Sequence, residues 1–367
     1  MCGLAGYFDF KGVSDNILSD MCFSLHHRGP DSRDIWRDDN IGLVHTRLSI
    51  LDLTSNGSQP MKSSSGRYVI IFNGEIYNHK KLRQTNQFQN YQWNSDTDTE
   101  TILELIEHYG ISKTLNEIEG MFAFALWDKK KKSLTLARDP LGQKPLYYGW
   151  INGKFLFASE LKAIRAINEL DFQIDRESLS IFVKVGFIPS PLTIYKGIKK
   201  LEPGKYCQLK PYLKNEIDYY TYYSLKDQID ETNKIKNTIT DSEYKNKLRN
   251  VLTSSVKKQQ ISDVPIGAFL SGGIDSSLIT ALMQETNDKQ IDTFTIGFEN
   301  TNYDESTHAR EISRVIGTRY HEIIVNYKSI QDIIPLIPTI YDEPFSDSSQ
   351  LVTYLISKFA REKVTVS

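Results

Sequence analysis

Met1-Cys2-Gly3-Leu4-Ala5-Gly6-Tyr7-Phe8 opens the chain and decides how its first half is expected to fold. The apolar run from Leu4 to Phe8 predicts a strand that holds the N-terminus inside a sheet. Removal of Met1, which a small second residue permits, would leave Cys2 with a thiol and a free α-amino group. That amine can act as the general base for the thiol. The alternative is a small buried hydrophobic residue without chemistry, so the choice depends on the residues downstream.

Length and composition bound the class of protein. At 367 residues the chain exceeds one ordinary core and suggests about two domains. A formal net charge of -2 gives no electrostatic argument for nucleic acid or an anionic membrane as a partner. Three cysteines are too few for a disulfide framework, which favours a reducing compartment. Because the sequence shows neither a signal peptide nor an apolar run of roughly 18 residues, we expect a cytoplasmic protein without membrane spans.

Residues 1–208 are predicted to form an α+β domain of antiparallel sheets layered with helices. Hydrophobic patterning predicts helices at Leu18–Leu25 and Thr99–His108. Asn152-Gly153 is typical of a hairpin turn. Strands rich in hairpins, with helices beside them, favour the antiparallel arrangement. The predicted strands are Ile41–Ile50, Arg67–Phe72, Phe122–Trp127, Ser133–Ala137, Leu146–Trp150 and Lys154–Ala158.

Residues 209–240 are polar and show no sustained period, so we interpret them as a linker. The helix expected next, Asp241–Gln259, places Tyr244, Leu248, Val251, Leu252 and Val256 on one face. Residues 241–367 then alternate strands with helices, which predicts an α/β domain with a parallel, doubly wound sheet. The expected strands are Pro265–Leu270, Thr293–Phe298, Tyr320–Val325 and Val364–Ser367, and the expected helices are Ser277–Glu285, Glu305–Ile316, Ile330–Ile337 and Ser349–Arg361.

Leu270-Ser271-Gly272-Gly273-Ile274-Asp275-Ser276-Ser277 follows a predicted strand and opens a predicted helix. Glycines let the backbone approach a phosphate closely, and N–H groups at a helix N-terminus point at the anion. The serine hydroxyls add donors, and Asp275 could hold Mg²⁺ against the phosphates. It is not a Walker A loop, because no Gly-Lys-Ser/Thr follows. We therefore prefer a phosphate site to a plain glycine-rich turn.

These motifs also carry a family resemblance. Phe269–Ser277 resembles the pyrophosphate loop of the N-type ATP pyrophosphatases, which cleave ATP to AMP and pyrophosphate. The first half resembles the class II glutamine amidotransferase domain, an N-terminal nucleophile (Ntn) hydrolase fold. The two halves in this order resemble bacterial-type, glutamine-hydrolysing asparagine synthetase, which implies a homodimer. The motifs that carry the resemblance of the first half are Cys2–Gly6, His27–Asp31, His45–Ile50, Phe72–Asn78, Asp98–Glu100 and Ala137–Gly142.

The resemblance assigns roles in a glutamine site. Cys2 would attack the glutamine side-chain amide and form a glutamyl thioester. The side-chain amide of Asn73 and the backbone N–H of Gly74 would hold the oxyanion. Arg47 would bind the glutamine carboxylate, and Asp98 would pair with the glutamine ammonium. Four further residues complete the implied glutamine-binding set: Leu48, Ile50, Leu51 and Glu75.

Each of these residues also has a plain interpretation that needs no ligand. Arg47 would be a surface charge, and Asp98 a helix N-cap. Asn73-Gly74 would be a hairpin turn. His27–Asp31 is kept as a structural segment that shapes the wall of the glutamine pocket.

In the second half the resemblance implies ATP and Mg²⁺. The adenine and ribose would lie near Leu270 and Ile296, and Asp304 and Glu305 are weaker candidates for the metal or the acceptor. Tyr341–Phe345 resembles a family segment, although a solvated acidic turn is an equal alternative. Ser367 matches the first residue of an acidic loop in the family, so we expect a C-terminally truncated chain and an incomplete ATP domain. The expected phosphate-binding residues are Ser271, Gly272, Gly273, Asp275, Ser276, Ser277 and Ser367.

The function expected from these assignments is that of an ATP-dependent, glutamine-hydrolysing amidotransferase. Ammonia released at Cys2 would convert an adenylated carboxylate to an amide, and aspartate is the simplest acceptor. One alternative is a sugar uronic acid of a surface polysaccharide, suggested by Glu343–Gln350. A second is glutaminase activity alone, in a fragment. A third is a non-catalytic glutamine or nucleotide sensor, against which the intact set of Cys2, Arg47, Asn73 and Asp98 argues.

Overall fold

The computed structural model describes residues 1–210, 216–234, 240–299 and 304–367 and divides into two units. Unit 1 comprises Met1–Ile235 together with Asp342–Phe345, and unit 2 comprises Lys236–Tyr341 and Ser346–Ser367. Residues 211–215 and 235–239, which belong to the expected linker, lie outside the described residues. We keep 1–208 and 241–367 as our proposal for the domain boundaries.

Unit 1 contains antiparallel sheets, as the sequence predicted. Its described residues form two of them, with six strands each. The strand expected from the first residues is β1, and it lies inside the first sheet between β9 and β3. In sheet order, the first sheet contains β10 (Ile198–Lys200), β8 (Tyr147–Ile151), β9 (Lys154–Ala158), β1 (Gly3–Asp9), β3 (Ile41–Arg47) and β2 (Ser32–Arg37). In sheet order, the second sheet contains β12 (Ile217–Thr221), β11 (Lys205–Leu209), β7 (Ser133–Arg138), β6 (Gly120–Asp128), β5 (Tyr68–Ile76) and β4 (Met61–Lys62).

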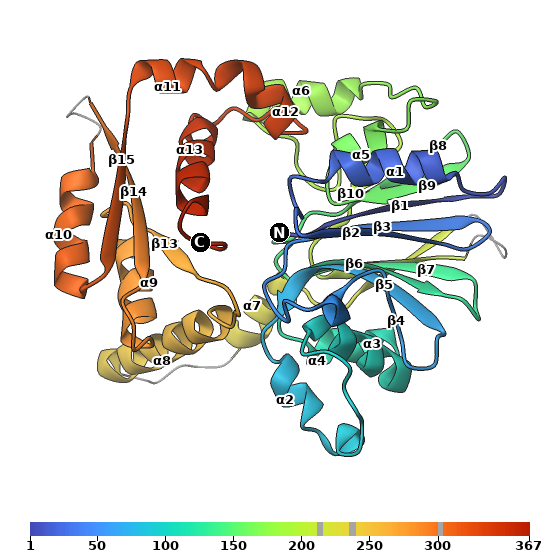
Figure 1. Cartoon of the computed structure of the whole chain (residues 1–367), viewed down its shortest axis with the longest axis horizontal. Helices are drawn as coiled ribbons and strands as arrows, with labels where there is room; N and C mark the ends of the chain where they lie inside the picture. The colour runs from blue at the N-terminus through green and yellow to red at the C-terminus, as the bar shows by residue number, and fades with distance from the viewer. Residues whose placement is uncertain (211–215, 235–239, 300–303) are drawn as a thin grey trace. The chain divides into compact units, whose positions relative to one another are not determined.

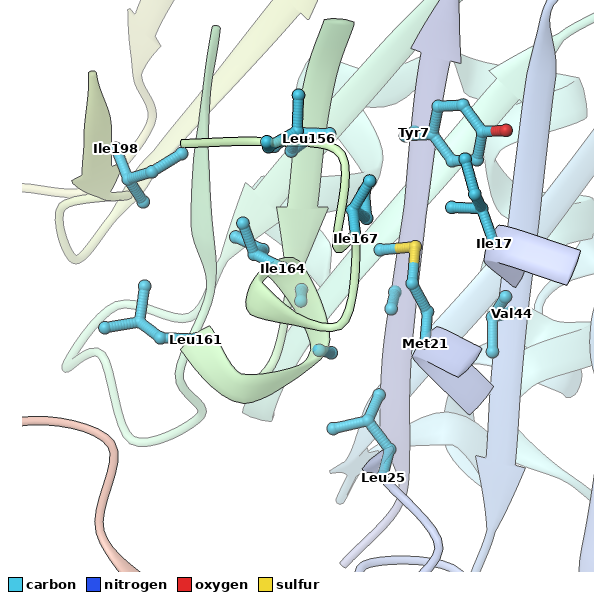
Figure 2. Close-up of a cluster of buried hydrophobic side chains, with 14 of the residues drawn as sticks. Tyr7, Ile17, Met21, Leu25, Val44, Leu156, Leu161, Ile164, Ile167 and Ile198 are labelled. Carbon is cyan, nitrogen blue, oxygen red and sulfur yellow. The ribbon is translucent and has the colours of Figure 1, made fainter. Parts of the chain in front are cut away.

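Helices cover the outer faces of both sheets, so unit 1 has four layers (Figure 1). Alternate side chains of β1 enter two different cores, because successive residues of a strand point to opposite faces. Tyr7 packs beneath α1 and α5 (Figure 2), whereas Leu4 and Phe8 pack between the two sheets. Burial on both faces explains the uninterrupted apolar run at the N-terminus. The α-helices of unit 1 are α1 (Asp15–Ser24), α2 (His79–Arg83), α3 (Asp98–Tyr109), α4 (Ile111–Glu117), α5 (Leu161–Arg165), α6 (Arg176–Val185) and α7 (Leu225–Asn233).

Several predicted boundaries shift for reasons of strand pairing. The strand expected at Ile41–Ile50 ends at Arg47, which is also the last residue that pairs with β2. The strand expected at Arg67–Phe72 continues to Ile76, because β6 pairs with it along its whole length. The hairpin at Asn152-Gly153 is confirmed, with φ of 49° and 79°.

The segment interpreted as a linker contains regular structure. β12 pairs with β11 at the edge of the second sheet, and Tyr220 stacks on Tyr206 with ring centroids 4.7 Å apart. α7 follows it. The polar composition of this segment did not indicate a strand. At the edge of a sheet a strand can leave side chains such as Tyr219 and Tyr220 partly exposed, so it needs no apolar face of its own.

Unit 2 contains a parallel sheet, as predicted, and its described strands lie in the order β13-β14-β15. Figure 1 shows α10 and α13 on opposite sides of this sheet, as in a doubly wound fold. The strands are β13 (Gly267–Phe269), β14 (Asp292–Phe298) and β15 (Arg319–Val325), and the α-helices are α8 (Asp241–Gln259), α9 (Ile274–Glu285), α10 (Ser306–Ile316), α11 (Tyr327–Gln331), α12 (Ile337–Ile340) and α13 (Ser349–Arg361).

Two expectations for unit 2 were wrong. The helix predicted at Ile330–Ile337 is broken into short turns, because Pro335 and Pro338 lack the N–H group that a helix interior requires. The strand predicted at Val364–Ser367 is reduced to one bridge, between Val366 and Ile266.

The predicted helix at Asp241–Gln259 is confirmed as α8, with the same bounds. Its apolar face is only partly covered, because Tyr244, Leu248 and Val251 are exposed while Val256 enters the core.

Among the helices that the structure describes, none combines the length and the apolar character needed to cross a bilayer.

Candidate active site

Cys2 lies directly before β1, where strand pairing begins with Gly3 opposite Thr46. It is half-buried, unlike Cys22 and Cys207, which are buried in the cores of unit 1. The Cys2 thiol donates to the carbonyl of Leu48, with 3.6 Å between Sγ and O. Burial raises the pKa of this thiol, and the nearby N-terminal charge only partly offsets the effect. The thiol therefore needs a base to react near neutral pH.

Asn73 and Gly74 occupy the interior of β5, so the hairpin-turn interpretation was wrong. The Asn73 side chain is buried, and its Nδ2 finds no hydrogen-bond acceptor among the described residues. A Cβ atom on Gly74 would lie 2.3 Å from the carbonyl oxygen of Met121, so only glycine fits this close approach of β6. An unsatisfied buried donor costs free energy, which a bound anion would recover.

Arg47 is buried at the end of β3, which excludes the surface-charge interpretation. Its guanidinium donates to the carbonyls of Leu51 (3.2 Å), Asp52 and Thr54 (2.7 Å). These bonds hold the loop after β3 in place. They use at most three of the five guanidinium N–H donors, so donors remain for a carboxylate.

Asp98 is the first residue of α3, and it is not the helix cap. Thr97 is the N-cap, and its Oγ1 accepts from the N–H of Glu100. The Asp98 carboxylate accepts from the N–H of Ile76 at 2.7 Å, which ties α3 to the end of β5. Burial raises the pKa of Asp98 to about 6. A buried carboxylate of this kind is suited to pair with a cation such as an ammonium group.

The two sheets meet beside these residues. His45 of β3 hydrogen-bonds through Nε2 to the carbonyl of Phe72 on β5, at 3.0 Å. Burial lowers the pKa of His45 to about 4, so the ring is neutral near pH 7. Gly3 pairs with Thr46, and the charges of Glu75 and Arg47 both act on the Cys2 thiol. The start of β1 therefore lies near the end of β3 and the end of β5. The half-buried residues Leu48, Ile50 and Leu51 belong to the loop that Arg47 orders.

Sequence reasoning missed the residues that hold the main chain of Cys2. Arg28, which we treated only as part of a structural segment, donates from Nε to the carbonyl of Cys2 at 2.9 Å. The Arg28 guanidinium in turn donates to Glu160 at 2.6 Å. The motif His27–Asp31 was a usable signal for Arg28. No pattern in the sequence marks Glu160.

The predicted phosphate loop joins β13 to α9. Gly272 has φ of 81°, and Gly273 is the N-cap of α9 with no side-chain cap hydrogen bond. The hydroxyls of Ser271 and Ser276 lie 3.0 Å apart, and Ser277 donates to the carbonyl of Gly273 at 2.6 Å. The start of α9 is therefore a turn with serine hydroxyls and uncapped N–H groups, which suits an anion.

The other residues expected near ATP are only partly gathered around this loop. A Cβ atom on Gly272 would lie 3.5 Å from the carbonyl oxygen of Glu305, so the start of α10 adjoins the predicted phosphate loop. Asp304 caps its own turn, because it accepts from the N–H groups of Phe298 and Ser306. Ser367 is exposed and follows the bridge to Ile266, at the opposite end of β13 from the loop. Leu270 is buried at the end of β13, and Ile296 is half-buried in β14.

Asp342 and Glu343 belong to unit 1 and do not form a solvated turn. Asp342 pairs with Lys162 at 3.5 Å, and Glu343 pairs with Lys200 at 2.7 Å. Both carboxylate side chains are about one-tenth exposed. The solvated interpretation was therefore wrong, because both carboxylates are paired and largely covered.

Asp275 is exposed in the first turn of α9. Within the described ranges, no group of three or more His, Cys, Asp or Glu side chains could hold a metal ion. Mg²⁺ is commonly held by one or two carboxylates together with substrate phosphates. One carboxylate beside the predicted phosphate loop fits that pattern.

Comparison with known proteins gives a match for each half of the chain. A glutamine amidotransferase domain model matches residues 1–223, and an asparagine synthase model matches residues 247–367. Asparagine synthetase [glutamine-hydrolyzing] 1 of Bacillus subtilis is 35% identical over all of this chain and 57% of its own length. A putative asparagine synthetase [glutamine-hydrolyzing] 2 of Methanocaldococcus jannaschii is 37% identical over all of this chain and 73% of its own length. Asparagine synthetase B of Escherichia coli is 32% identical over 93% of this chain and 58% of its own length.

The chain thus spans less than two thirds of the length of two of these three curated relatives. Among solved structures, the glutamine phosphoribosylpyrophosphate amidotransferase of Bacillus subtilis with ADP and GMP superposes with a TM-score of 0.47 at 15% identity. That match covers 88% of this chain and 65% of the other.

Proposed function

The chain belongs to the glutamine-hydrolysing asparagine synthetase family, and we propose that it hydrolyses glutamine at Cys2 and transfers the ammonia to an ATP-activated carboxylate. The simplest acceptor is aspartate, which would give asparagine. The proposal is carried by one observation about Asn73. Its buried side-chain Nδ2 has no hydrogen-bond acceptor among the described residues. An oxyanion formed during attack by Cys2 would provide the missing acceptor.

The chemistry proposed for unit 1 begins with removal of Met1. The freed α-amine takes the proton of the Cys2 thiol, and the thiolate attacks the side-chain carbonyl carbon of glutamine. Asn73 Nδ2 and the N–H of Gly74 donate to the oxyanion. The C–N bond then breaks, the proton returns to the leaving nitrogen, and ammonia leaves. Water hydrolyses the thioester, which releases glutamate and restores the thiol.

Binding of glutamine is proposed to depend on two buried charges of opposite sign. Arg47 would hold the α-carboxylate with its remaining guanidinium donors. Asp98 would hold the α-ammonium with its buried carboxylate, which also accepts from the N–H of Ile76. Leu48, Ile50, Leu51 and Glu75 would line the same site through their backbone.

The chemistry proposed for unit 2 uses the loop before α9. The acceptor carboxylate attacks the α-phosphorus of ATP and displaces pyrophosphate, which gives an acyl-adenylate. Ammonia then attacks the acyl carbon, and AMP leaves. Ser271, Ser276, Ser277 and the first N–H groups of α9 would hold the phosphates. Asp275 would carry Mg²⁺, which neutralises phosphate charge when bound.

The test uses Cys2→Ala in the full natural chain. AMP release is measured with aspartate and either glutamine or ammonium as the nitrogen source. The variant should lose the glutamine-dependent reaction and keep the ammonium-dependent one. Loss of both reactions in a folded protein would contradict this division of labour. Replacing aspartate with uronic acids tests the alternative acceptor, and glutamate release without acceptor-dependent AMP would identify a glutaminase only.

Two further properties belong to the proposal. Homodimer formation, which the family resemblance implies, is tested by light scattering of the purified protein. A cytoplasmic location is tested by fractionation of the native cells.

A further inference from the structure

Glu160 is the centre of a charged cluster at the end of β9. Its Oε1 accepts from Arg28 Nη1 at 2.6 Å, and its Oε2 lies 3.0 Å from Nε2 of His27 and 3.1 Å from Nζ of Lys162. Lys162 also pairs with Asp342 at 3.5 Å. Two carboxylates therefore balance one guanidinium and one ammonium, with the imidazole at the exposed edge of the cluster.

The cluster reaches the main chain of Cys2 through a single side chain. Arg28, with only 7% of its side chain exposed, donates to Glu160 through Nη1 and to the carbonyl of Cys2 through Nε. Sheet pairing of β1 begins at Gly3. The bond from Arg28 therefore holds the residue that lies just outside the ladder.

Ser159, the neighbour of Glu160, holds the other side of the same segment. It is fully buried, its N–H donates to the carbonyl of Leu4 at 2.8 Å, and its Oγ accepts from the N–H of Leu4 at 3.1 Å. Two consecutive residues thus secure the chain on both sides of Gly3. Ser159 holds Leu4 directly, and Glu160 holds Cys2 through Arg28.

We propose that Ser159-Glu160 is a positioning element for the nucleophile, which fixes the main chain of Cys2 so that its thiol faces the glutamine carbonyl. This inference rests on the proposed function. Neither residue touches the reacting atoms, so both act through position alone. A small displacement of a reacting group can reduce a rate by about 10²-fold, which makes the anchoring of a chain terminus relevant to turnover.

The charge of Glu160 is constant over any practical assay range. Burial alone would raise its pKa, but the hydrogen bond from His27 and the charge of Arg28 outweigh burial and lower the pKa from 4.5 to about 2. Loss of this charge would leave Arg28 without its carboxylate partner. Glu160→Gln therefore tests the anchor with little change of shape.

The experiment compares Glu160→Gln, Glu160→Asp and Glu202→Gln with the unmodified full chain. Glu202 forms an exposed pair with Lys205 and serves as the matched control. Glutamate release gives kcat and KM for glutamine, and hydrogen–deuterium exchange of the N-terminal peptide reports the anchoring itself. We expect Glu160→Gln to lower kcat about tenfold or more, with KM within about twofold, and to speed exchange in that peptide. Glu160→Asp should restore part of the rate, and Glu202→Gln should change neither readout.

An unchanged kcat, or unchanged exchange at the N-terminus, would overturn the inference while leaving the proposed function intact. An unmodified protein that releases no glutamate would instead contradict the proposed function, and the exchange measurement would still decide whether Glu160 anchors Cys2. If Glu160 had only a structural role, Glu160→Gln would lower the thermal stability of the protein and would not lower kcat selectively over KM. If Glu160→Gln does not fold, Ser159→Ala, which removes one hydroxyl only, decides the question in the same assays.

Discussion

A Cβ atom on Gly57 would lie 2.1 Å from Nη2 of Arg47. The guanidinium therefore occupies the space that any other side chain at position 57 would need. The same nitrogen donates to the carbonyls of Leu51 and Asp52, so the position of Arg47 depends on this glycine and on the loop after β3. The orientation of the proposed carboxylate clamp is thus set in part by a residue that has no side chain.

Gly57→Ala is expected to displace Arg47 and weaken glutamine binding. Loss of a hydrogen bond to a charged group costs about 1.5–3 kcal/mol, so KM should rise about tenfold or more. Steady-state glutamate release measures this. Gly66→Asn is the matched control, because Gly66 has φ of 71° with nothing near its Cβ position, and asparagine tolerates that conformation. An unchanged KM in Gly57→Ala would contradict a role for Arg47 in binding.

Asp98→Asn should stabilise the fold and weaken glutamine binding at the same time. Burial raises the pKa of Asp98 from 3.8 to about 6, so its contribution to stability is present below pH 3.8 and is lost as the pH rises through about 6. An uncharged amide avoids that loss and can still accept from the N–H of Ile76. Near neutral pH the gain should be at most about 3 kcal/mol. Urea unfolding should show a gain near pH 7 and little near pH 4, and a gain that does not depend on pH would contradict this account.

Labelling of Cys2 by iodoacetamide should be slow near neutral pH and should rise as the solution becomes more alkaline. Burial raises the pKa of the thiol, and only the thiolate reacts. Removal of Met1 should speed labelling near neutral pH, because it places a free amine beside the thiol. Mass spectrometry of the N-terminal peptide measures the rate. The buried Cys22 and Cys207 are internal controls, and rapid labelling of Cys2 at neutral pH with Met1 retained would contradict the assignment.

Gly272→Ala should weaken nucleotide binding. Gly272 has φ of 81°, and a Cβ there would lie 3.1 Å from the backbone N of Ala309. The unfavourable φ of an alanine at this position and its close contact with Ala309 would both shift the loop that carries Ser271 and Ser276. The Kd for an ATP analogue should therefore rise about tenfold or more. Gly317→Asn is the control, because that glycine has φ of 86° with open space around its Cβ position. Equal affinities in the two variants would contradict a phosphate site at this loop.

Local sequence patterns predicted the elements whose own residues decide their structure. β1, the helix at Asp98–Tyr109, the hairpin at Asn152-Gly153 and the helix at Ser349–Arg361 all follow from periodicity or turn chemistry within a short window. The loop that we propose for phosphate binding was predicted in the same way. Its glycines and serines are adjacent in sequence, so no distant contact was needed to predict a loop between a strand and a helix.

Patterns failed where a partner from elsewhere in the chain decides the outcome. β12 is polar and became a strand only because β11 offered an edge. Asn73 and Gly74 looked like a turn until β6 paired with both of them.

The sequence by itself determined the chemistry available to this protein, namely a thiol at position 2 and a strand–loop–helix turn suited to phosphate. Only the tertiary structure decided how the thiol is held. Arg28 and Glu160 are separated by 132 positions along the chain, and they meet because β9 pairs with β1 while α5 packs beside α1. Such a contact leaves no local period or spacing in the sequence, because its geometry comes from the packing of the sheet and its helices.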